Sequence, residues 1–258
     1  MPSENNRYLL KFKDVSLSFG SVQALTDINF GLTEGEILGI IGPNGAGKTC
    51  ILNCISGYYM PRRGDIRYGN HSLKKMSRHH RPGFGIARTF QNIELFKGLT
   101  TIQNLMLGRH HFMKGNLPAQ CVYLGWYRRK EIEHRGVAEE ILDFLEMNEI
   151  RNRVVGTLPY GFQKRVQLGQ ALAMEPRLLM LDEPMAGMNL EEREDMARFI
   201  LDIKEDKDVT IILIEHDMEV VMDICDRIIV LNYGRKIADG FPSEIKEEPE
   251  VIKAYLGE

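Results

Sequence analysis

Several features that would assign the chain to a specialised class are missing from the sequence. No apolar run approaches the roughly 20 residues that a membrane-spanning helix requires, and no internal repeat or low-complexity segment is present. The formal net charge is −3, so the basic excess typical of nucleic-acid-binding proteins is lacking. The first residues do not combine a basic segment with an apolar one, so no signal peptide is predicted. We therefore expect a soluble, cytoplasmic protein with no nucleic-acid partner.

Cysteine is also scarce, and its spacing argues against a disulfide framework. The four cysteines, which form no C-x-x-C pair, are Cys50, Cys54, Cys121 and Cys225. Free buried thiols in a reducing compartment are the prediction, and metal binding is the alternative. The chain is long enough to form a globular fold, because 258 residues, 43% of them hydrophobic, can bury a sizeable core.

One stretch carries a sharply defined chemical motif. Residues 42–49 read G-x-x-x-x-G-K-T, directly after the apolar run Ile37–Ile41 and directly before Cys50–Ile55, which is predicted to be a helix. Glycines let such a loop wrap closely around a polyphosphate, while its N–H groups and the helix N-terminus direct positive charge at the anion. Lys48 is expected to reach the β- and γ-phosphates, and Thr49 to offer its hydroxyl to Mg²⁺. The residues predicted to bind the nucleotide here are Gly42, Pro43, Asn44, Gly45, Ala46, Gly47, Lys48, Thr49 and Cys50. An accidental glycine-rich turn is the alternative, which the flanking strand and helix disfavour.

A pair of acids follows another apolar run. Leu178–Leu181 is typical of a parallel strand covered on both faces, and Asp182, Glu183 and Pro184 come directly after it. We expect Asp182 to hold the Mg²⁺ shell and Glu183 to polarise an attacking water. Neighbouring side chains on a strand point to opposite faces, so the two acids share a site only if the strand ends there, as Pro184 favours. An acidic turn after a core strand is the alternative.

The remaining patterns predict an α/β fold. Antiparallel strands are predicted at residues 8–19, 24–33 and 64–69, where apolar and polar residues partly alternate. Further strands are expected at 84–90 and 211–214, with a hairpin of 228–231 and 236–238 around Tyr233-Gly234. Helices are expected within 100–150, at 190–205, at 218–225 and in two short pieces from Pro242. Residues 109–130 lack a clear period and are interpreted as a surface insertion.

These motifs together resemble those of an ATP-binding cassette (ABC) subunit, the motor of ABC transporters, over nearly the whole chain. The resemblance implies a P-loop NTPase fold with a RecA-like parallel-sheet core, an antiparallel β subdomain and a helical signature subdomain. The chain 1–258 is then a single ABC ATPase domain. Residues 1–91 and 177–241 would form the nucleotide-binding core with the antiparallel part, 92–176 the helical subdomain with its insertion, and 242–258 a helical tail.

The resemblance also implies roles for three residues outside the phosphate loop. Phe19 matches the aromatic residue that stacks on adenine, whereas its alternative is an ordinary strand residue facing the core. Gln91 matches the glutamine that contacts Mg²⁺ or water and links the site to the helical subdomain. His216, at the end of a predicted strand, matches the switch histidine near the γ-phosphate, and a structural histidine is the alternative. Catalysis is thus expected from Glu183, His216 and Gln91.

The signature region departs from the family's L-S-G-G-Q. At Leu158–Val166 the chain has Pro159 for the serine and Tyr160 for the first glycine, and Phe162 replaces the glutamine. Gly161 and the following helix remain, so Tyr160 and Gly161 are still expected at a phosphate. Ala186–Asn189 likewise replaces the usual Ser-Ala-Leu-Asp.

These departures and the closing segment 251–258 resemble the ATP-binding subunits of branched-chain amino-acid importers. The resemblance implies ATP and Mg²⁺ as cofactors and a second cassette as partner, in a heterodimer or a homodimer. It also implies transmembrane permease subunits, an indirectly linked solute-binding protein, and a place on the cytoplasmic face of the inner membrane. An ABC ATPase for export or lipid extraction, and a regulatory nucleotide-binding module, are the alternatives. A GTPase is disfavoured, because no N-K-x-D motif occurs.

Two features of the molecular surface are also predicted. The segment Gln91–Phe96 is expected to receive the permease's coupling helix, with Ile93, Leu95 and Phe96 exposed for it, although local core packing competes with that interpretation. Basic clusters are interpreted as solvated faces, with contacts to anionic lipid head groups as the alternative. They are Arg62-Arg63, Lys74-Lys75, Arg78-His79-His80-Arg81 and Arg128-Arg129-Lys130.

Overall fold

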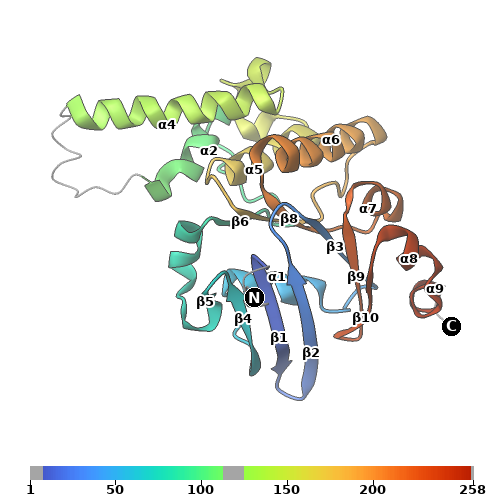
Figure 1. Cartoon of the computed structure of the whole chain (residues 1–258). Helices are drawn as coiled ribbons and strands as arrows, with labels where there is room; N and C mark the ends of the chain where they lie inside the picture. The colour runs from blue at the N-terminus through green and yellow to red at the C-terminus, as the bar shows by residue number, and fades with distance from the viewer. Residues whose placement is uncertain (1–7, 113–124, 257–258) are drawn as a thin grey trace.

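Two sheets organise the computed structural model, which describes residues 8–112 and 125–256. A four-stranded antiparallel sheet has the order β2-β1-β4-β5, and a six-stranded sheet has the order β10-β9-β3-β8-β7-β6 (Figure 1). The first contains β1 (Leu10–Phe19), β2 (Val22–Leu32), β4 (Arg63–Tyr68) and β5 (His71–Ser72). The second contains β3 (Ile37–Ile41), β6 (Ile86–Arg88), β7 (Leu178–Asp182), β8 (Thr210–Ile214), β9 (Arg227–Asn232) and β10 (Arg235–Gly240). Its pairings are parallel except for the β9–β10 hairpin, so the predicted α/β class is confirmed.

The helices divide into a packed set around the six-stranded sheet and a separate group at one end of the molecule. Helices α2 (Thr101–Gly108), α4 (Gly125–Phe144) and α5 (Tyr160–Leu172) form that end group (Figure 1). The others are α1 (Lys48–Ser56), α6 (Leu190–Lys207), α7 (Met218–Ile224), α8 (Pro242–Glu247) and α9 (Pro249–Leu256). The two tail helices predicted from Pro242 are therefore present.

Burial of the central strands on both faces explains their continuous apolar sequences. All five residues of β8 are buried; Ile212 and Ile214 belong to a core shared with α1 and the antiparallel sheet. Ile211 and Leu213 belong to the core on the opposite face, together with α6 residues such as Phe199. Successive side chains alternate between faces, so a strand sandwiched this way needs an apolar residue at every position.

Two predicted segments differ from the structure in their boundaries. The strand expected at 84–90 is limited to β6, because residues 78–84 form a 3₁₀ helix that ends at Gly85, whose φ is +78°. Within the predicted insertion 109–130, Arg109–Phe112 is a 3₁₀ helix and α4 already begins at Gly125. The rest of that insertion, 113–124, lies outside the described residues.

Arg81 contradicts the prediction that its basic cluster is a solvated face. Its side chain is 2% exposed, and its guanidinium donates to the carbonyls of Cys54 (2.8 Å), Ile55 and Leu73 (2.8 Å). The carbonyls at a helix C-terminus lack intrahelical partners, so a buried guanidinium there satisfies several at once. Arg78, His79 and His80 are exposed, in agreement with the prediction.

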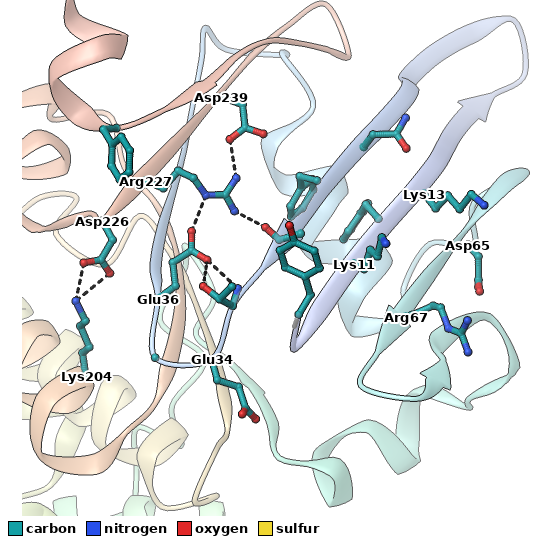
Figure 2. Close-up of a pocket in the computed structure, with 18 residues that line it drawn as sticks. Lys11, Lys13, Glu34, Glu36, Asp65, Arg67, Lys204, Asp226, Arg227 and Asp239 are labelled. Atoms are coloured by element: carbon teal, nitrogen blue, oxygen red, sulfur yellow. Dashed lines mark hydrogen bonds and ion pairs between the residues drawn. The ribbon is translucent and has the colours of Figure 1, made fainter. Parts of the chain in front are cut away.

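A half-buried cation joins the two sheets. Arg227 of β9 donates to Glu36 and Asp239, at 2.6 Å each, and to the carbonyl of Gly31 in β2. It lies at an open groove of about 1370 Å³, where Figure 2 shows its guanidinium between the two carboxylates. Because these charges are paired with one another, we interpret this region as a structural junction of the sheets.

Candidate functional site

The phosphate loop follows β3 and has a backbone that only glycine can adopt at two positions. Gly42 has a φ of +145°, and a Cβ there would lie 2.1 Å from the carbonyl oxygen of Leu231. Gly47 has a φ of +104°, and a Cβ there would meet the carbonyl oxygen of Ala24 at 2.9 Å. Both positions combine left-handed backbone with close neighbours, so the glycines are required for the loop's shape.

Lys48, the first residue of α1, lies inside this loop. It is 7% exposed, and its ammonium donates to the carbonyls of Gly42 (2.6 Å) and Pro43 (3.1 Å). Burial lowers the pKa of Lys48, and the carboxylates of Glu183 and Asp182 partly oppose that shift. Thr49 follows on the exposed side of the same first turn. A cation and a hydroxyl are therefore presented together at the N-terminus of α1.

The two predicted acids share one site because the strand ends at Asp182 and the backbone bends at Glu183. Asp182 ends β7 and is 3% exposed, with its Oδ2 accepting from Arg88 Nη2 at 2.8 Å. Glu183 has a φ of +50°, in the left-handed region that non-glycine residues rarely adopt. Its N–H still donates to the carbonyl of Ile214 at 2.9 Å. The strand thus ends where Pro184 predicted, and the bend directs Glu183 to the site.

Two of the three residues predicted to be catalytic, Gln91 and His216, contact the carboxylate of the third, Glu183. Gln91 Nε2 donates to Glu183 Oε2 at 2.8 Å, and His216 Nε2 lies 2.8 Å from Glu183 Oε1. The His216 side chain is 46% exposed, so the cluster is open to solvent, whereas the Glu183 side chain is only 14% exposed and is largely shielded. A shielded carboxylate held by two partners can orient or deprotonate a water.

Three charged residues behind this cluster were not predicted as site residues. Arg88 pairs with Asp182 and also donates to Asn53 Oδ1 at 2.7 Å. Glu215 is 4% exposed, and burial raises the pKa of its carboxyl, which accepts hydrogen bonds from the N–H groups of Met185 (2.7 Å) and His216 (3.1 Å). Lys164 of α5 is also buried. Most of their partners lie far away in sequence, and only the presence of charged residues beside buried strands could have indicated them.

The signature residues lie at the start of α5, away from the phosphate loop's own contacts. Pro159 is the N-cap, as its tolerance of helix starts predicted, and Tyr160 is 44% exposed. A Cβ on Gly161 would lie 2.2 Å from Glu192 Oε1, and Tyr160 approaches Gly187. Both neighbours, Glu192 and Gly187, belong to the segment that follows Glu183. Among the described contacts, Tyr160 and Gly161 therefore do not reach the phosphate loop of their own chain.

Two aromatic predictions have different outcomes. Phe19 is 46% exposed and makes an edge contact with Tyr59, with 4.8 Å between ring centroids, so the core-facing alternative is wrong. In the segment expected to receive the permease, Phe96 is 63% exposed and Ile93 is half-buried. Leu95 was predicted to be exposed but is 9% exposed, because it packs into the same hydrophobic core as Leu105 and Leu158.

The cysteines that the structure describes are free, as predicted. Cys50 is half-buried, and Cys54 and Cys225 are buried. Burial raises the pKa of Cys54 and of Cys225 to about 12. Cys121 lies outside the described residues. Across residues 8–112 and 125–256, no cluster of three or more His, Cys, Asp or Glu side chains could hold a metal, and no helix is long and apolar enough to cross a membrane.

Tail helix α9 reaches the phosphate loop. Burial raises the pKa of the Tyr255 hydroxyl, and the nearby backbone N–H of Gly42 opposes that shift. Val251 of the same helix is 4% exposed and anchors it to the core. The first residue of the loop therefore contacts the C-terminal segment of the chain.

Comparison with known proteins agrees with this geometry. The family model described as "ABC transporter" matches residues 25–186, and "Branched-chain amino acid ATP-binding cassette transporter" matches 235–258. A protein of Pseudomonas aeruginosa, "High-affinity branched-chain amino acid transport ATP-binding protein BraF", is 40% identical over 98% of this chain and 99% of its own. A solved cassette of an ABC transporter in its ADP conformation has a TM-score of 0.84 and 29% identity, covering 97% of this chain and 99% of its own. The dimeric structure of another bacterial cassette has a TM-score of 0.75 and 25% identity, covering 90% and 98%.

A phosphate loop on β3, acids at the end of β7 and a matching family model define the class: the chain belongs to the ABC transporter family of ATP-binding proteins. It binds ATP and is an ABC ATPase whose hydrolysis is coupled to transport. Within that family it belongs to the branched-chain amino-acid transport subfamily, as the ATP-binding motor subunit of an importer.

Proposed function

We propose that Glu183 is the group that orients or deprotonates the attacking water during ATP hydrolysis. The observation that carries this proposal is the convergence of Gln91 and His216 on its two carboxylate oxygens at 2.8 Å each. Lys48 binds the β- and γ-phosphates, and His216 stabilises the charge that develops on the transferred group. The buried lysine ammonium is already inside the loop, so little reorganisation is needed.

The loop N–H groups at Gly42–Cys50 cradle the phosphates, and Phe19 stacks on the adenine. The exposed ring of Phe19, supported at its edge by Tyr59, leaves a face available for a base. The whole chain acts as one cassette, with 1–91 and 177–241 as the nucleotide-binding core, 92–176 as the helical subdomain and 242–258 as the tail.

Mg²⁺ would be held by Thr49, Gln91 and Asp182. Their hydroxyl, amide and carboxylate oxygens are the donors that Mg²⁺ prefers, and few protein ligands suffice where phosphates and waters supply the rest. Thr49 is exposed, and Arg88 occupies only Oδ2 of Asp182 among the contacts described. The ion would neutralise phosphate charge when bound.

A second cassette completes the ATP site. Tyr160 and Gly161 lie away from this chain's phosphate loop, which supports their use against the nucleotide of a partner. The partner is a second cassette, in a heterodimer whose other member has a more regular signature, or in a homodimer. ATP bound between the two favours the closed pair by its differential affinity, and hydrolysis reopens it.

The motor works on permease subunits at the cytoplasmic face of the inner membrane, supplied by a solute-binding protein. The cargo is a branched-chain or other hydrophobic amino acid, or a related small solute. The exposed ring of Phe96 supports docking of the permease's coupling helix near Gln91. Because Pro159 offers no hydroxyl, the ATP site that this chain completes for its partner is weaker than the one it forms with its own loop. Equal losses after replacing Glu183 and the partner's equivalent would contradict that asymmetry.

The test is ATPase activity and uptake of labelled leucine by the transporter purified through a tag on this chain and reconstituted with its binding protein. Glu183→Gln should lower kcat by about a hundredfold or more, and Glu219→Gln, an exposed acid on α7, should have no effect. Full activity in Glu183→Gln would overturn the assignment. Nucleotide binding without turnover in the unsubstituted complex would indicate a regulatory module, and turnover with outward transport would indicate an exporter.

A further inference from the structure

The ammonium of Lys164 contacts two separate segments of the proposed nucleotide site. The residue lies one turn into α5 and is 2% exposed. Its Nζ donates to the carbonyl of Gln91 at 2.8 Å and to the carbonyl of Glu183 at 3.2 Å. It also lies 5.9 Å from the ring centre of Tyr160, at the start of the signature helix.

Burying the Lys164 ammonium costs free energy unless hydrogen bonds and nearby negative charges compensate for its lost hydration. Two carbonyls supply the hydrogen bonds, and the carboxylates of Glu215, Glu183 and Asp182 supply the charge. A methionine of similar length would fill the same space without that requirement.

The carbonyl that Lys164 holds belongs to the strained residue of the site. Glu183 has a φ of +50°, which other parts of the structure must stabilise. Its N–H donates to Ile214 on β8, and its carbonyl accepts from Lys164, so the residue is held from both sides. Gln91 is held by the same ammonium through its carbonyl, and its amide donates to the Glu183 carboxylate.

We propose that Lys164 is a positioning residue for ATP hydrolysis, which links the signature helix α5 to the carboxylate of Glu183. It does not touch the nucleotide; it sets the backbone of Gln91 and Glu183 so that their side chains meet. A displacement of α5 moves both residues together, so the position of the helical end group controls the geometry of the acid. This inference rests on the proposed role of Glu183.

The chain offers a matched comparison in Gln167, one turn further along α5. Its amide donates to the carbonyl of Asn92 at 3.1 Å, and it is 5% exposed. Gln167→Leu therefore removes a buried bond between α5 and the same loop, but leaves the backbone of Glu183 untouched. Lys164→Met removes both of the bonds made by the ammonium, and Lys164→Arg keeps a cationic donor.

The experiment compares these variants in the purified transporter complex by kcat, KM for ATP, nucleotide affinity and thermal stability. Lys164→Met should lower kcat by about tenfold to a hundredfold, because small misplacements of a catalytic group have effects of that size. Nucleotide affinity should change by less than about threefold, since Lys164 makes no phosphate contact. Lys164→Arg should recover part of the rate, and Gln167→Leu should lose less than about threefold.

A second measurement separates positioning from general loss of structure. In single-turnover experiments on Glu183→Gln, adding Lys164→Met should change the residual rate by less than about threefold, because residues that act through one group are not additive. Multiplicative losses in the double variant would overturn the inference, as would an unchanged kcat in Lys164→Met. If Glu183→Gln alone kept its rate, the proposed function would fail instead. If Lys164→Met does not fold, Lys164→Arg is tested in its place. A partial loss of kcat in Lys164→Arg alone, with no further loss of the residual rate when it is added to Glu183→Gln, would support the inference. A further loss of that residual rate would overturn it.

Discussion

Replacing Arg81 by methionine should destabilise the protein strongly, although it lies far along the chain from the helix that it supports. Its guanidinium donates to the carbonyls of Cys54, Ile55, Leu73 and Met76 at the end of α1 and the following segment. Methionine fills similar space but donates nothing, so the cost is that of carbonyls left without partners.

The magnitude follows from counting those carbonyls. Within the described contacts, the oxygen of Cys54 also accepts from Gly57 and that of Leu73 from Met76, whereas Ile55 and Met76 rely on Arg81. Each unsatisfied carbonyl costs about 1–3 kcal/mol, and removing the buried guanidinium charge offsets part of that cost. The free energy of unfolding should therefore fall by about 2–4 kcal/mol. For a chain of this size that corresponds to a fall in Tm of roughly 4–15 °C.

Urea and thermal unfolding of the purified chain measure this loss directly. Arg78→Met is the matched control, because Arg78 lies in the same basic cluster but is exposed. It should change stability by less than about 0.5 kcal/mol. If Arg81→Met lost no more than Arg78→Met, the carbonyls would have other partners, and the account of α1 termination would be wrong.

Three further changes test the nucleotide site. Gly42→Ala should weaken ATP binding more than about tenfold, because the Cβ would lie 2.1 Å from the Leu231 carbonyl at a φ of +145°; equilibrium binding of a fluorescent nucleotide measures this, and unchanged affinity would contradict it. At pH 8 a maleimide should label Cys50 before Cys54, whose pKa of about 12 leaves roughly one thiolate in ten thousand; mass spectrometry follows the order, and ATP should protect Cys50. Tyr255→Phe should raise the nucleotide Kd by about fivefold, since the hydroxyl beside the Gly42 backbone N–H is lost, and calorimetry that found no change would disconnect α9 from the loop.

The nucleotide site could be predicted largely because its chemistry is local. The loop at Gly42–Thr49 needs glycines, a lysine and a hydroxyl at fixed spacing, since backbone conformation and phosphate contact are both determined within eight residues. The acids Asp182 and Glu183 were identifiable for the same reason, as they end a continuous apolar strand. The resemblance to ABC subunits indicated Gln91 and His216, and the structure places both side chains 2.8 Å from the carboxylate of Glu183.

Contacts between distant segments could not be predicted in this way. Arg81 and Lys164 are typical surface residues by composition, and each becomes buried only because its partners arrive from elsewhere: Arg81 from 27 residues away, Lys164 from 73. Likewise, nothing in the sequence Asp-Glu-Pro specifies the φ of +50° that turns Glu183 into the site. The sequence by itself therefore determined where the phosphate loop and the pair of acids lie along the chain, because a phosphate-binding loop needs those residue types at that spacing. The tertiary structure alone decided which charges are buried to hold them, because burial depends on the packing of the whole chain.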